Sequence, residues 1–241
     1  MMGTQHNGSR GAVEVTRFAR RRCARAPTDR GGIGYAPRVP EIRALERRHV
    51  PEAGRLLGRA FVDNPAQLAA LERLSPARRA RVVEAIHASF CAAAVEHWTA
   101  DALYEGERML GAMLVLEPGV YPPSLRARLT ALRGALGAGL HGLRNYLRIE
   151  EHMQGLHPTH PHYYLFIIGV DPPQQGRGHG RALLEALNGR ADGRGLPCYL
   201  ETDRASSVRL YEGVGYRVLT DVCLAAVGGL RMWTIRRDPA R

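Results

Sequence analysis

The residues whose types and spacing could support chemistry gather in a glycine-rich segment at positions 175–180, Gln-Gly-Arg-Gly-His-Gly. An almost wholly apolar run at 163–170, typical of a strand buried on both faces, precedes it, and an amphipathic run at 181–192 follows it. Glycines at such a strand-to-helix turn let backbone amides converge on an anion, and the helix N-terminus adds the positive end of its dipole. The segment therefore predicts a phosphate site, and a pyrophosphate is the ligand that suits it best.

The basic residues restrict the kind of phosphate site. All 34 are arginines, so P-loop, pyridoxal and protein-kinase chemistries, which need a lysine, are excluded. The dinucleotide fingerprint G-x-G-x-x-G is the nearest rival, and Glu201 stands where its acidic residue would be. Its third glycine would fall on Arg181, however, and too little chain follows Gly176 for the rest of a Rossmann sheet.

Two separated motifs resemble those of the GNAT N-acetyltransferase superfamily. The first is Gln/Arg-x-x-Gly-x-Gly/Ala after a strand that ends Val-x-Pro, and it matches residues 170–180. The second, Asn-x-x-x-Tyr-x-x-x-Gly-Phe, matches residues 207–216, with Ser207 for the asparagine and Tyr216 for the phenylalanine. Within the superfamily the chain is most similar to the puromycin N-acetyltransferase branch, through residues 61–65, 153–156, 199–202 and 232–233.

The resemblance implies an α+β fold of the GNAT type, a mixed and mostly antiparallel central sheet splayed between two strands and flanked by helices. It covers residues 153–235 closely and 40–117 loosely, so we expect residues 40–241 to form a single domain. It also implies that acetyl-CoA lies in the splay, as a cosubstrate. The implied cofactor-binding residues are Ile168, Val170, Gln175, Gly176, Arg177, Gly178, His179, Gly180, Arg181 and Ser207.

The implied reaction is direct attack of an amine on the thioester, with the oxyanion stabilised by a backbone amide. Tyr211, in the second motif, is then the expected general acid for the departing thiolate; a tyrosine that merely packs under the sheet is the alternative. The general base stays open between Glu150, Glu151, His152 and Glu201, a chain of waters, and no dedicated base.

Other candidate residues receive structural interpretations. The three histidines of residues 157–162 lie among prolines without nearby acids or cysteines, so we expect a surface loop, and no metal. His179 is expected to face phosphate or solvent, and Trp98 and Trp233 to pack in the core.

The function implied is an acetyl-CoA-dependent N-acetyltransferase acting on the primary amine of a small molecule, such as an antibiotic or an aminonucleoside. Acetylation of a protein or peptide amine is one alternative. A catalytically silent domain that senses acyl-CoA is another, suggested by Ser207. A monomer or a homodimer would suit each of these functions.

The elements around these motifs follow from hydrophobic periodicity. We expect strands at 40–44, 102–105, 109–116, 163–170, 197–201, 216–222 and 231–235, the second and third forming a hairpin. Helices are expected from residue 50, after Ser75-Pro76, and at 181–192 and 206–214. A leucine-rich stretch at 124–153, interrupted by glycines, predicts two helices or one broken helix packed on its own domain.

Charge and cysteine content indicate the setting. Residues 1–40 carry eight arginines against Glu14 and Asp29, which is +6 of the net +11. We expect residues 1–39 to be a basic, disordered extension, with a tail that binds nucleic acid or membrane as the alternative. Four scattered cysteines favour reduced thiols in a cytoplasmic protein, and no apolar run approaches the ~20 residues of a membrane span. We therefore expect no membrane partner, and nucleic acid is an improbable one.

Overall fold

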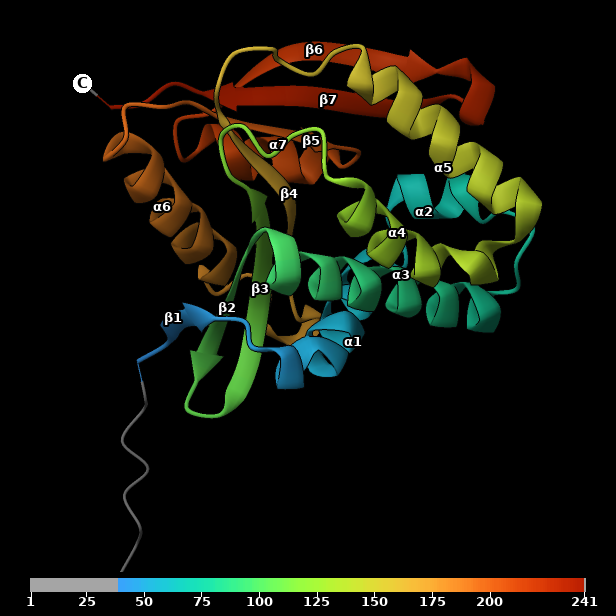
Figure 1. The fold of residues 1–241 in the computed structure, drawn as a ribbon, viewed down its shortest axis with the longest axis horizontal. Helices are drawn as coiled ribbons and strands as arrows, with labels where there is room; N and C mark the ends of the chain where they lie inside the picture. The colour runs from blue at the N-terminus through green and yellow to red at the C-terminus, as the bar shows by residue number, and fades with distance from the viewer. Residues whose placement is uncertain (1–38, 241) are drawn as a thin grey trace, which may run out of the picture. The chain divides into compact units, whose positions relative to one another are not determined.

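The computed structural model describes residues 39–240, so the expectation for the N-terminal extension lies outside the described residues. Its centre is a seven-stranded mixed sheet with the order β1-β2-β3-β4-β5-β7-β6 (Figure 1). The strands are β1 Glu41–Ala44, β2 Thr99–Glu105, β3 Arg108–Leu116, β4 Tyr163–Val170, β5 Cys198–Thr202, β6 Arg217–Leu224 and β7 Leu230–Arg237. The helices are α1 Val50–Phe61, α2 Pro65–Ala70, α3 Pro76–His97, α4 Leu125–Ala135, α5 Gly139–Gln154, α6 His179–Asp192 and α7 Ala205–Glu212.

The expected splay lies between β4 and β5, the one parallel pair of the described sheet. These strands pair only from Tyr163–Leu165 to Cys198–Leu200, while β4 continues along β3 as far as Val170. From residue 166 onward the β5 side of β4 therefore has no partner strand. The prediction of a mixed, mostly antiparallel sheet splayed between two strands is confirmed.

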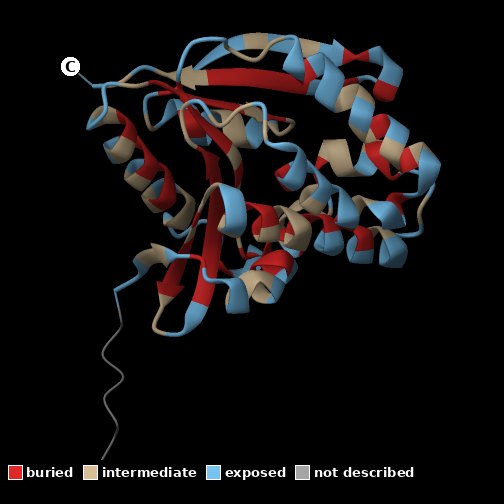
Figure 2. Cartoon of the chain, viewed as in Figure 1, coloured by how far each residue is buried: buried red, intermediate tan, exposed pale blue. Residues whose placement is uncertain are grey.

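Helices cover both faces of the sheet, which explains why β3 and β4 read as continuous apolar runs. On one face α6 inserts Leu183, Leu184 and Leu187 among β-strand residues, and α7 adds Tyr211. The other face packs against α1 and α3 (Figure 1), through residues such as Leu57. Burial is most continuous along the central strands (Figure 2). Trp233 lies in the first of these clusters and Trp98 packs against the second, as expected.

The leucine-rich stretch folds as expected into two helices, with a break at Gly139, whose φ of +70° lies in the left-handed region. Its leucines, however, do not pack on the domain. Leu129 is 52% exposed and Leu136 is 74% exposed, while Ala127 and Gly134 are buried. Because Gly134 lets α4 approach the backbone of α3 closely, only small side chains fit the contact face. The stretch packs on its own domain as expected, through small residues and not through its leucines.

Most other elements match the predictions within a few residues. The hairpin of β2 and β3 is present, and α6 begins at His179, two residues before the predicted start. The short helix α2 was not predicted. Within residues 39–240, no helix combines the length and the apolar character needed to cross a membrane.

Candidate functional site

The splay between β4 and β5 opens into a cavity of about 490 Å³. Its walls come from the unpaired half of β4, the glycine-rich turn, the start of α6, the end of β5 and one face of α7. Of the residues predicted to form the site, those that line it are Ile168, Val170, Gln175, Gly176, Gly178, His179, Gly180, Arg181, Ser207 and Tyr211. β4 and α7, which lie far apart in the sequence, thus bring both motifs to one cavity.

The glycine-rich turn owes its shape to two residues in the left-handed region. Gly176 has φ +76° and Gly178 has φ +83°, and no other atom lies within 4 Å of where a Cβ would be. These glycines are therefore required by backbone conformation, since the space beside them is open. The first hydrogen bond of α6 runs from the backbone amide of Ala182 to the carbonyl oxygen of Gly178, at 3.0 Å. The backbone amides that precede Ala182 in the turn are therefore free at the cavity edge.

The end of β4 is held rigidly where the turn begins. Arg59 of α1 donates from Nε and Nη2 to one carboxylate oxygen of Asp171, at 3.0 and 2.8 Å. Gln175 in turn donates from its side-chain amide to the carbonyl of Val170 at 3.0 Å. The two prolines after Asp171 cannot continue a sheet ladder, so the strand ends there. The position of the turn is thus fixed from both sides.

The predicted arginines differ in their surroundings. Arg181 lies at the cavity edge, exposed, and its Nε donates to Glu185 at 2.8 Å. Arg177 is exposed and does not line the cavity. Arg204 lines it although the sequence analysis did not single it out. The free amides of the turn and of α6 are thus accompanied by two arginines at the cavity.

Tyr211 is buried on α7 and lines the cavity. Burial raises its pKa well above the usual value for tyrosine, and the charge of nearby Asp203 acts in the same direction. The phenol therefore keeps its proton at neutral pH, which is the protonation state that a general acid needs.

Glu201 is the only one of the four candidate general bases that lines the cavity. Glu150, Glu151 and His152 are exposed on α5. The Glu201 side chain is 12% exposed, and it accepts hydrogen bonds from Tyr164 at 2.7 Å and from Tyr199 at 3.1 Å. Burial raises the pKa of both tyrosines, so both donate as neutral phenols.

The histidine-rich segment at 157–162 is not the surface loop that was expected. The side chain of His157 is 4% exposed and His162 is 7% exposed. Of the three histidines, only His160 is exposed. His157 is stacked on Tyr121, with 3.6 Å between ring centroids. The prolines correctly predicted that this segment is a loop. Aromatic residues from β4, β5 and the segment after β3 nevertheless cover the loop. Within residues 39–240, no three histidine, cysteine or acidic side chains converge as a metal site would require.

The chain is similar to known proteins both in sequence and in structure. Residues 137–216 match the family described as Acetyltransferase (GNAT) family. A crystal structure of a histone acetyltransferase HPA2 and related acetyltransferase from Corynebacterium glutamicum superposes with a TM-score of 0.58, at 21% identity, over 84% of this chain and 97% of that one. The chain has the GNAT fold.

Two curated relatives each match part of the chain. A mycothiol acetyltransferase of Kineococcus radiotolerans is 45% identical over 67 residues, which is 26% of this chain and 22% of the relative. The N-alpha-acetyltransferase RimI of Mycobacterium tuberculosis is 44% identical over 79 residues, which is 32% of this chain and 49% of the relative. The chain therefore spans half or less of the length of these relatives.

Proposed function

We propose that the chain is an acetyl-CoA-dependent N-acetyltransferase that transfers the acetyl group to a primary amine in a ternary complex. The observation that supports this most is the cavity at the β4–β5 splay, which contains both a glycine-rich turn with free amides and a buried, protonated tyrosine. The two curated relatives are described as acetyltransferases.

The residues of the cavity fit acetyl-CoA as cosubstrate. The turn at 175–181 offers backbone amides and a helix N-terminus to a pyrophosphate, with Arg181 and Arg204 nearby. The unpaired stretch of β4, including Ile168 and Val170, offers its backbone to the amide groups of the pantetheine arm. Ser207 at the start of α7 is a short hydroxyl side chain within the same wall.

Glu201 is the proton acceptor that we select for the amine. It lies in the cavity wall together with Asp203, so an ammonium group entering there meets two carboxyl groups. An ammonium ion must lose a proton before its nitrogen can attack the thioester carbonyl. Tyr211 then donates a proton to the leaving sulfur, so the acid and the base lie on α7 and β5, within one cavity.

The acceptor amine belongs, in this proposal, to a small molecule, and the puromycin N-acetyltransferase branch remains a prediction from the motifs. The aromatic walls given by Phe61 and Phe166 suit an amine attached to an apolar group. Acetylation of a protein N-terminus is the second candidate, supported by the match to RimI. The mycothiol acetyltransferase match is the corresponding support for a small molecule.

Release of free thiol from acetyl-CoA, measured against a panel of small amines and short peptides, tests the proposal. We expect release with at least one amine, and a kcat about 10²- to 10⁴-fold lower in Glu201→Gln, with unchanged acetyl-CoA affinity. Glu212→Gln makes the same chemical change at an exposed position at the end of α7 and should leave the rate unchanged. Binding of acetyl-CoA without thiol release for any amine would favour the silent sensor instead.

A further inference from the structure

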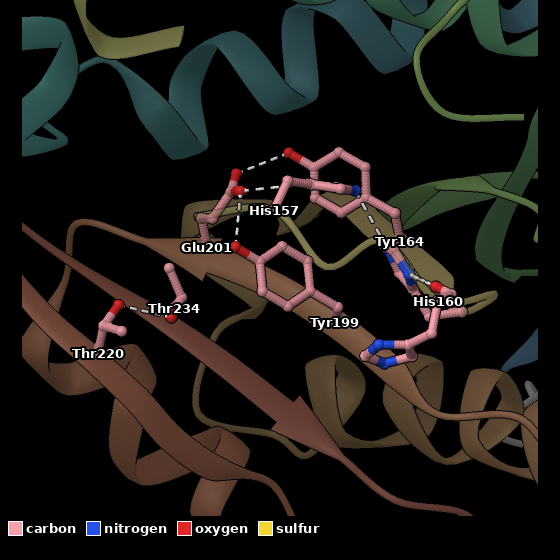
Figure 3. A network of polar contacts seen from close by, with 8 residues as sticks. His157, His160, Tyr164, Tyr199, Glu201, Thr220 and Thr234 are labelled. Carbon is pink, nitrogen blue, oxygen red and sulfur yellow. Dashed lines mark hydrogen bonds and ion pairs between the residues drawn. The ribbon is translucent and has the colours of Figure 1, made fainter. Parts of the chain in front are cut away.

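A chain of buried polar side chains leads from the cavity wall into the segment at 157–162 (Figure 3). We propose that Glu201 passes the proton it takes from the amine to His157, and that His162 holds His157 in the tautomer that can receive it. This inference rests on the acetyltransferase function proposed above.

The contacts are continuous. Oε1 of Glu201 lies 3.7 Å from Nδ1 of His157. On the other side of that ring, Nε2 of His157 lies 3.1 Å from Nε2 of His162. The remaining nitrogen of His162, Nδ1, lies 2.7 Å from the backbone carbonyl oxygen of His160. The three side chains come from β5 and from the segment before β4.

The backbone carbonyl of His160 sets the direction of the hydrogen bonds made by the two histidine side chains. A carbonyl can only accept, so Nδ1 of His162 carries a hydrogen. Burial lowers the pKa of His162 and keeps it neutral, which leaves its Nε2 as an acceptor. His157 must then donate from its own Nε2. When His157 is neutral, its Nδ1 is a lone pair that faces the carboxyl group of Glu201.

The groups around His157 favour this role. Its ring stacks on Tyr121, and the edges of Tyr164 and Tyr199 lie against it at centroid distances of 4.8 and 4.9 Å. Burial raises the pKa of all three tyrosines, so each stays neutral and none competes for the proton. An aromatic face also attracts an imidazolium cation. His160 and Arg236 are charged or titratable groups that act on His162, and Glu150 and Arg128 act on Tyr121.

The proton balance of the acetylation explains why a proton must leave Glu201. An ammonium substrate and acetyl-CoA yield an amide, a thiol and one free proton. The nitrogen loses two protons in all: one restores the phenol of Tyr211 after that group has protonated the sulfur, and Glu201 takes the other. The N–H bond of the amine breaks and an O–H bond forms on Glu201; that bond then breaks as an N–H bond forms at Nδ1 of His157. Glu201 returns to its carboxylate form while the reaction is still in the cavity. The proton afterwards leaves to bulk water from the pair of histidines.

Kinetics of single and double variants test the transfer. We expect His157→Gln to lower kcat roughly tenfold with an unchanged KM for acetyl-CoA, and to flatten the acidic limb of the pH–rate profile. Because His157 acts through Glu201, adding His157→Gln to Glu201→Gln should cost less than a further twofold. His97→Gln, at the exposed end of α3, is the matched control and should keep the wild-type rate. Multiplicative losses in the double variant would overturn the inference.

Nitrogen NMR of the full chain labelled at histidine tests the tautomers without any substrate. We expect His162 to show a protonated Nδ1 and a bare Nε2, with signals assigned by comparison with His162→Gln. A His162 protonated at Nε2 would overturn the inference even if the kinetic variants failed to fold. An enzyme that shows the expected tautomers but releases no thiol with any amine would instead contradict the proposed function, so the two failures are distinguishable.

Discussion

The role proposed for Tyr211, protonation of the leaving sulfur, makes a prediction about a single atom. Tyr211→Phe removes the hydroxyl and keeps the ring, so we expect kcat to fall about 10- to 100-fold while the Kd of acetyl-CoA is unchanged. Turnover and calorimetric binding measure the two quantities separately. An unchanged kcat would show that Tyr211 only packs under the sheet.

Tyr216 offers the matched control for that experiment. It is also buried, but its hydroxyl donates to Asn188 at 2.9 Å and does not line the cavity. Tyr216→Phe should therefore lower the thermal midpoint, because Asn188 loses its partner, and leave kcat unchanged. Opposite effects of the two substitutions would separate chemistry from packing.

Which site residues the sequence could predict depends on how local their signals are. The glycine turn was predictable because backbone conformation and helix start are set within a few residues of Gly176 and Gly178. Glu201 remained one of several candidate bases because its burial depends on Tyr164, 37 residues away. His157 was misassigned for the same reason, since the ring that covers it belongs to Tyr121. No local pattern carries such contacts.

The helix pair α3–α4 shows the same limit for whole elements. Periodicity correctly placed both helices, but it did not show that the leucines lie outside the contact face. The backbone separation between the helices decides the face, and Gly134 sets that separation. A Cβ at Gly134 would lie 2.3 Å from the carbonyl oxygen of Ala85. Leucines cannot occupy such a contact, so they turn outward.

An inverted pattern of mutational sensitivity along α4 follows from this packing. Gly134→Val should destabilise the protein by about 1–3 kcal/mol, because the clash outweighs the few tenths of a kcal/mol that valine gains in helix propensity. Leu136→Gln, at the exposed position directly after α4, should change the free energy of unfolding by less than ~0.5 kcal/mol. Urea denaturation of both variants measures the difference. A leucine substitution costing more than the glycine substitution would contradict the packing described here.

For the molecule as a whole, the site results from topology. β5 joins the sheet parallel to β4 for only three residue pairs, and this short pairing creates the opening between them. The presence and approximate position of each strand were predictable from sequence, as were both motifs. The resemblance to GNAT proteins supplied the splay itself, because pairing between distant strands depends on contacts that no local pattern records. Function thus depends on a long-range arrangement built from locally predictable parts.

The stability of the entire fold should depend on His87, a buried histidine of α3. It is 2% exposed on α3, beside Phe61, and its Nδ1 donates to the carbonyl of Val83 at 2.7 Å. Burial lowers its pKa from 6.5 to about 4, so the unfolded chain binds the proton more readily. Its contribution is fully present above pH 6.5 and is lost as the pH falls toward 4, by up to roughly 3 kcal/mol.

Removing the titrating group should remove that dependence. His87→Leu keeps a buried side chain of similar size, so we expect its free energy of unfolding to fall less steeply than that of the wild type between pH 6.5 and 4. His152→Gln, exposed on α5, should retain the wild-type slope. Urea titrations at a series of pH values measure the slopes directly. A group makes stability depend on pH only if its pKa differs between the folded and the unfolded state. Equal slopes in His87→Leu and the wild type would therefore mean that the acid sensitivity arises from the carboxylates and not from this histidine.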